Sequence, residues 1–205
     1  MSQRRRLTIV LGLNVAMIAA LVIVGLAARS LGALAAGGDY VADSTAIGLG
    51  ILAVSIRERK GPESKAPTYV AGINAAALLA VSMFVLVAGV RRLVEGTPEI
   101  HGLPVLIVSS IATAVMLVGV FVLGTGAGTE DLHMRSVLLD TIADAVASAA
   151  VAVGGAVIYA TGRYYWVDST LSIVIALVVG AGAVHLLRDV IRALRSGVAL
   201  DLDDD

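Results

Sequence analysis

The chain has 205 residues, of which 58% are hydrophobic and 15% are charged, and its formal net charge is −1. A mean hydropathy of +0.93 is typical of an integral membrane protein, and the balance of basic and acidic residues argues against a nucleic-acid partner. The absence of cysteine excludes disulfides and thiolate metal ligands. We expect one domain over residues 1–198 and a short acidic tail over residues 199–205.

Six apolar runs follow one another along the chain, each close to the ~20 residues that cross a bilayer as a helix. The first, at residues 7–28, follows the basic cluster Arg4–Arg6 and is too long for the apolar region of a signal peptide, so we expect an uncleaved helix. The others cover residues 31–56, 69–90, 105–123, 132–159 and 167–187, with Gly, Pro and charged residues between several of them. The sequence therefore predicts an all-α, polytopic membrane protein with six transmembrane helices, whose partner is the lipid bilayer.

Lys and Arg are shared unevenly between the two sides of such a six-helix arrangement. Eleven lie on the side of the two termini, and the opposite side holds only Arg29, Arg91, Arg92 and Arg163. Because basic residues concentrate in cytoplasmic loops, both termini are predicted to be cytoplasmic.

Four aspartates lie inside the predicted spans, as the pairs Asp39/Asp43 and Asp140/Asp144. A carboxylate in the hydrocarbon region costs roughly 2.5–3.5 kcal/mol even on a lenient insertion scale, so such residues are usually functional. A spacing of four residues places both members of a pair on one helix face. Counted at about 1.5 Å per residue, both pairs fall near the middle of a hydrocarbon layer about 30 Å thick. Two facing helices would thus offer four carboxylates to one point.

Charge repulsion and loss of water would keep some of these carboxyl groups protonated unless a cation binds them. The pattern therefore predicts a site that exchanges a divalent metal for protons, with no covalent chemistry and hence no enzyme activity. Oxygen-only ligands favour Mn²⁺, whereas Zn²⁺ also binds carboxylates and stands above Mn²⁺ in the Irving–Williams order. The residues leave zinc and manganese both open, with iron and cobalt as further alternatives.

Several segments resemble the cation diffusion facilitator family. Residues 30–44 resemble the second helix of that family, which carries a His/Asp-x-x-x-Asp metal pair, and residues 134–148 resemble its fifth helix. The resemblance continues through residues 159–168 and 186–197 and covers nearly the whole chain. It implies a proton-coupled exporter of divalent metals, most commonly zinc, in the inner membrane, usually as a homodimer and without a resident cofactor. The transport site it implies, working by alternating access, consists of Asp39, Asp43, Asp140 and Asp144.

Three features depart from the family pattern. Zinc-transporting members generally have His at one or two of the four ligand positions, the segment Lys65–Val70 lacks a family motif containing His and Gly, and a short acidic tail stands where a cytoplasmic domain is usual. These departures keep two alternatives open: a non-transporting membrane partner or metal-sensing subunit that retains the fold, and a proton or sodium pathway. Asp168, beside Trp166, is expected to be a structural helix cap at the membrane interface.

Overall fold

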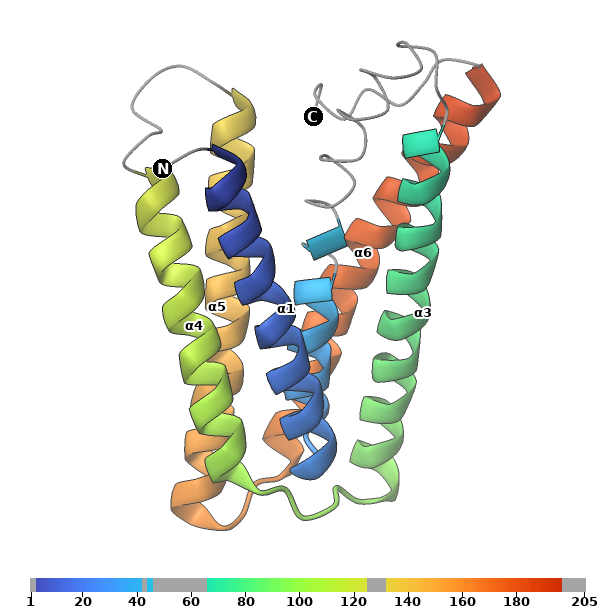
Figure 1. Cartoon of the computed structure of the whole chain (residues 1–205). Helices are drawn as coiled ribbons and strands as arrows, with labels where there is room; N and C mark the ends of the chain where they lie inside the picture. The colour runs from blue at the N-terminus through green and yellow to red at the C-terminus, as the bar shows by residue number, and fades with distance from the viewer. Residues whose placement is uncertain (1–2, 42–43, 46–65, 125–131, 197–205) are drawn as a thin grey trace.

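The computed structural model describes residues 3–41, 44–45, 66–124 and 132–196, which are helical except in short turns (Figure 1). Five long helices are α1 (Gln3–Ala27), α3 (Ala66–Glu95), α4 (Gly102–Gly124), α5 (Leu132–Thr161) and α6 (Trp166–Ser196). Between α1 and α3, residues 31–41 form a further helix, called here the 31–41 helix. Each of the six predicted runs therefore coincides with helix in the described chain, and the all-α prediction is confirmed. Most of the second run beyond residue 41 lies outside the described residues.

The end of α3 differs from the prediction. The apolar run was expected to end at residue 90, but the helix continues to Glu95. In this last turn Arg91 Nε lies 2.7 Å from Glu95 Oε2, a pair one helical turn apart. Gly96 follows with φ of +110°, a conformation that L side chains rarely adopt, and the helix ends there. The charged turn therefore extends the helix beyond its apolar part.

The helices are apolar on their outer faces as well as on their inner ones. On α3, for example, Ile73 is 71% exposed and Phe84 is 65% exposed. Three helical stretches in the described chain are long and apolar enough to cross a membrane: Ala71–Glu95, Ile142–Thr161 and Trp166–Arg195. An all-round apolar surface of this kind is stable against lipid rather than water. The structure thus supports a multi-pass membrane protein.

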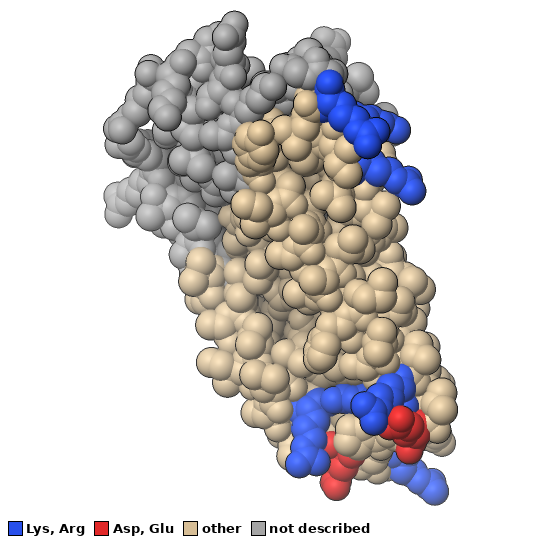
Figure 2. All heavy atoms as spheres, turned by 90° about the vertical axis from the view of Figure 1, so that its right-hand side faces the viewer, with Lys and Arg blue, Asp and Glu red and all other residues tan. Residues whose placement is uncertain are grey.

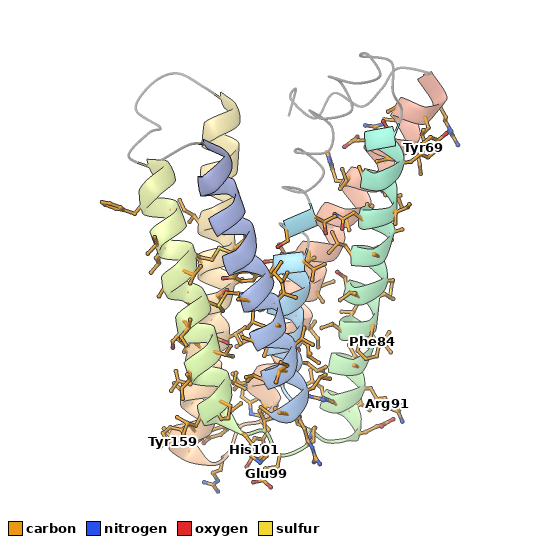
Figure 3. The ribbon with its side chains drawn as sticks, viewed as in Figure 1. Tyr69, Phe84, Arg91, Glu99, His101 and Tyr159 are labelled. Atoms are coloured by element: carbon orange, nitrogen blue, oxygen red, sulfur yellow. The ribbon has the colours of Figure 1, made fainter. Side chains whose placement is uncertain are left out.

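Charged and aromatic side chains mark the two ends of this apolar surface. On the face shown in Figure 2, charged side chains gather at both ends and leave a wide band between them. On α3 this band runs from Tyr69 past Phe84 to Arg91 (Figure 3), a rise of about 33 Å for a continuous helix. Such a length matches a hydrocarbon layer of about 30 Å. Tyr69 and Tyr159 are both exposed and lie at opposite ends, as is typical of aromatic residues at the two membrane interfaces.

The helices form two closely packed pairs, α4 with α5 and α3 with α6, and α1 packs on α4. One end of the bundle, called here the turn end, contains the connections at residues 28–30, 96–101 and 162–165. Away from the turn end, α3 and α6 diverge from α1, α4 and α5 (Figure 1). Toward the turn end a shared buried cluster joins the two pairs. It consists of Ala28, Ala35, Val85, Ile100, Val105, Val151, Ile158, Ile175 and Ala176.

Candidate metal site

The structure describes the side chains of two of the four predicted metal ligands. Asp39 lies in the 31–41 helix and Asp144 lies on α5, and both are half-buried. Asp140 lies one turn before Asp144 on α5, with its side chain outside the described part, and Asp43 is itself outside it. Within the described part, no three His, Asp or Glu residues are grouped closely enough to hold a metal. The four-aspartate site therefore stays a prediction, and the backbone register tells how well the helices fit it.

The 31–41 helix and α5 meet at Gly32 and Val151. A β-carbon on Gly32 would lie 3.4 Å from Val151 Cγ1, which is ordinary contact distance. The 31–41 helix leaves the turn end whereas α5 returns to it, so the two helices run in opposite directions. Asp39 is seven residues beyond Gly32, and Asp144 is seven residues before Val151. Both aspartates thus lie about 10 Å from this contact, toward the same end of the bundle.

The other two aspartates, Asp43 and Asp140, are also equally far from this contact in the sequence. In the sequence, Asp43 is eleven residues beyond Gly32 and Asp140 is eleven residues before Val151. Asp140 lies in α5, whereas Asp43 lies outside the described residues, so this second match is one of sequence count alone. The sequence positions of all four aspartates are therefore symmetric about the Gly32–Val151 contact.

The residues that follow Asp39 and Asp144 belong to one buried cluster. Tyr40 is 1% exposed and Ala145 is 4% exposed, and both pack in it. The other members come from α1, the 31–41 helix and α4: Met17, Leu21, Ala36, Val108, Ala112 and Met116. The Tyr40 hydroxyl donates a hydrogen bond of 3.0 Å to the carbonyl of Ala112 on α4. This cluster and its hydrogen bond fix the backbone next to both aspartates against α4.

Glycines allow the 31–41 helix to pack closely on two sides. A β-carbon on Gly37 would lie 3.3 Å from Leu21 Cβ of α1, and one on Gly38 would lie 3.3 Å from Val81 Cγ1 of α3. Gly38 also lines a small crevice whose other walls come from α3 and α6, including Ser82 and Ala176. The helix that carries Asp39 thus lies between α1 and the α3–α6 pair.

Asp168 has a role that its sequence position only partly revealed. It was expected to cap its own helix at the membrane interface, but it is 3% exposed and binds the N-terminus of the 31–41 helix. Its Oδ2 accepts a 2.8 Å hydrogen bond from the Leu31 amide, and its Oδ1 accepts bonds from Ser30 Oγ and from the Gly32 amide at 3.2 Å. The cap is therefore structural, as expected, but it acts on a different helix.

Ser30 and Tyr40 are two further polar residues near the site that were not singled out from the sequence. Ser30 is fully buried, and its hydroxyl oxygen accepts a 3.0 Å hydrogen bond from the Ala33 amide, so it is the N-cap of the 31–41 helix. A serine directly before an apolar run is a recognisable N-cap signal. Tyr40 gave no such signal, because its acceptor belongs to another helix.

Comparisons with known proteins agree with this architecture. Residues 7–195 match the family model described as the cation efflux transmembrane domain. The chain is 26% identical to the metal cation efflux system protein CzcD of Cupriavidus metallidurans, over 97% of this chain and 64% of that protein. It is 28% identical to the zinc transporter ZitB of Yersinia pestis, over 98% of this chain and 66% of that protein.

A third relative is the cadmium, cobalt and zinc/H(+)-K(+) antiporter of Bacillus velezensis, which is 25% identical over 87% of this chain and 59% of that protein. The chain spans between 59% and 66% of the length of these three relatives. By name all three are transporters of metal cations rather than enzymes. Since the family model covers nearly the whole chain, the protein belongs to the cation efflux family, the cation diffusion facilitators.

Proposed function

We propose that the protein exports divalent metal cations from the cytoplasm in exchange for protons. The transported metal binds at Asp39, Asp43, Asp140 and Asp144. The observation that carries this proposal is that Asp39 and Asp144 lie seven residues from the Gly32–Val151 contact, toward the same end of the bundle, and the other two aspartates stand at matching counts in the sequence. Carboxylates are too costly in the membrane to be kept at matched depth without a cation or protons to neutralise them.

Zinc is the proposed main substrate and manganese the second, with iron and cobalt as alternatives. Of the three relatives, one is named for zinc and another for cadmium, cobalt and zinc, whereas the third is named only for metal cations and none is named for manganese. Four carboxylates, on the other hand, form a harder ligand set than one with imidazole, and hard oxygen ligands suit Mn²⁺. Zinc binds carboxylate oxygen at about 2.0–2.2 Å in four-coordinate sites, so the ligand set admits both metals.

The arrangement of the helices supports alternating access as the mechanism. The α4–α5 and α3–α6 pairs are joined toward the turn end and diverge away from it (Figure 1). In the proposed orientation both termini are cytoplasmic, so the diverging end faces the cytoplasm and the turn end faces outward. Metal enters from the cytoplasm and displaces protons from the carboxyl groups. Protons from the outside later displace the metal. We also propose an inner-membrane location and assembly as a homodimer.

Uptake into proteoliposomes under a pH gradient tests the proposal directly. The parent protein should carry Zn²⁺ and Mn²⁺, measured beside Fe²⁺ and Co²⁺, and the double variant Asp39→Asn, Asp144→Asn should carry none. Asp189→Asn is the matched control, because Asp189 is an aspartate on α6 that pairs with His185 at 2.9 Å and with Arg192 at 3.1 Å. That variant should transport like the parent.

Two other outcomes would replace the proposal by its alternatives. A folded parent that binds metal without moving it would be a partner or sensing subunit that retains the fold. Flux of protons or sodium without any divalent metal would assign the same aspartates to a monovalent pathway.

A further inference from the structure

The N-terminus of the 31–41 helix is attached to α6 by one buried carboxylate. Asp168 receives three hydrogen bonds, from Ser30 Oγ and from the amides of Leu31 and Gly32. Amides in the first turn of a helix have no partner within that helix, and a negative charge there is favoured by the helix dipole. A buried carboxylate is in turn stable only when it is hydrogen-bonded. The carboxylate and the helix end therefore satisfy each other.

The atoms around this contact are packed closely and leave little room for the Asp168 side chain to move. A β-carbon on Gly32 would lie 2.9 Å from Asp168 Oδ1, closer than real β-carbons come to other atoms. Arg92, near the end of α3, donates a 2.7 Å hydrogen bond from Nη1 to the carbonyl of Arg29, and its charge acts on Asp168. Both helices of the α3–α6 pair thus contact the turn that precedes the 31–41 helix.

Capping the 31–41 helix does not by itself require a residue from α6. Ser30 already caps the 31–41 helix by accepting the Ala33 amide. Asp168 adds a link to α6, whereas Tyr40 links the other end of the same helix to Ala112 of α4. Asp39 lies next to Tyr40, about 12 Å along the helix from Leu31. The helix that carries this proposed ligand therefore bridges the two helix pairs.

We propose that Asp168 is a positioning residue for transport, because its hydrogen bonds fix the end of the Asp39 helix to α6 and form the joint about which the two helix pairs move. This inference rests on the proposed function. Asp168 itself does not touch the transported metal. Its loss slows the change in access and leaves metal binding nearly intact.

Asp168→Asn keeps the shape of the side chain but replaces one accepting oxygen by a donating amide group. Three donors then converge on a group that can accept at only one atom. We expect the kcat of Zn²⁺ uptake to fall about tenfold or more. The loss of one hydrogen bond to a charged group changes an equilibrium constant by about that factor. The Kd for Zn²⁺, measured by titration in detergent, should change by less than about threefold. Asp189→Asn should match the parent in both quantities.

Ser30→Ala is the second variant, and it decides the question if Asp168→Asn does not fold. It removes one donor and leaves the two backbone donors to Asp168 in place. Its kcat should fall in the same direction but less. The double variant Asp168→Asn, Ser30→Ala should be no slower than Asp168→Asn alone, because the effects of substitutions at two residues in contact do not add.

Each result either supports or overturns the joint. A purely structural role would lower the yield of folded protein and leave kcat per metal-binding molecule unchanged, which overturns the proposal. A loss of Zn²⁺ affinity equal to the loss of kcat also overturns it, because Asp168 would then belong to the metal site. An inactive parent would overturn the proposed transport function and the joint together, whereas an active parent with a normal Asp168→Asn variant overturns the joint alone.

Discussion

The contact between α4 and α5 depends on glycine at position 155. A β-carbon there would lie 2.7 Å from the Leu106 amide nitrogen and 3.1 Å from Leu106 Cα. Both are backbone atoms of α4, so neither can swing aside as the end of a side chain can. In Gly155→Ala, α4 would have to retreat by about 0.7 Å to restore an ordinary contact of 3.4 Å. This displacement would move α4 away from α5. The carbonyl that accepts the Tyr40 hydrogen bond lies on α4, and Asp144 lies on α5.

Gly182→Ala on α6 supplies the matched control, because nothing lies within 4 Å of a β-carbon at that position. Both substitutions gain about 1 kcal/mol of helix propensity, whereas only Gly155→Ala incurs an overpacking cost of about 1–3 kcal/mol. The difference in free energy of unfolding between the two variants is therefore the overpacking cost alone. At about 2–4 °C per kcal/mol for a chain of this length, it corresponds to a difference in Tm of several degrees.

Thermal unfolding of the purified variants in one detergent measures this difference. Gly182→Ala should unfold at or above the Tm of the parent, and Gly155→Ala should unfold at or below it and several degrees below Gly182→Ala. Gly102→Ala, where the β-carbon would lie 2.5 Å from the Tyr159 amide nitrogen, opens the same contact from α4. Its effect should add less than fully to that of Gly155→Ala. Equal Tm values for Gly155→Ala and Gly182→Ala would refute the close packing of α4 and α5.

Three shorter predictions concern the helix that carries Asp39. Tyr40→Phe keeps the buried ring but removes the bond to Ala112, so the free energy of unfolding should fall by about 0.5–1.5 kcal/mol; an unchanged value in denaturation would mean that the bond contributes nothing. Gly32→Ala places a β-carbon against Asp168, so the kcat of Zn²⁺ uptake should fall while the Kd stays unchanged, and a normal kcat would contradict the tight fit. Asp39→His should raise the ratio of Zn²⁺ to Mn²⁺ uptake in competition assays, because imidazole suits Zn²⁺ better; a constant ratio would show that Asp39 is not a ligand.

The helices could be predicted from the sequence because a span in lipid must be both apolar and long, and few other structures meet those conditions. Their ends were less predictable. The apolar pattern ends before Arg91, but the helix continues to Glu95, since a charged turn is as compatible with helix as an apolar one. Hydropathy thus locates the part of a helix that lies in the membrane rather than the helix itself.

The depth of the aspartate pairs stays a prediction, made from the rise of a helix and the start of each span. The Gly32–Val151 contact adds, by a route that does not use hydropathy, that Asp39 and Asp144 lie at equal distances from one helix contact. By contrast, no local pattern reveals that Asp168 binds Leu31, which is 137 residues away in the sequence. Such a partner depends on which helix ends meet at the turn end, and this is a property of the packing.

The two attachments of the 31–41 helix bear on how a metal site could keep its shape while access to it changes. Lipid provides no hydrophobic force between helices, so close packing and polar contacts must determine which helices stay together. Tyr40 attaches the helix to α4 beside Asp39, and α4 packs on α5, which carries Asp144. The two aspartates therefore belong to one packed unit. Asp168 attaches the far end of the helix to α6, in the other pair. A relative movement of the pairs must then be absorbed close to the Asp168 contact at the turn end, and the two proposed ligands can stay at a constant separation while the α3–α6 pair moves past them.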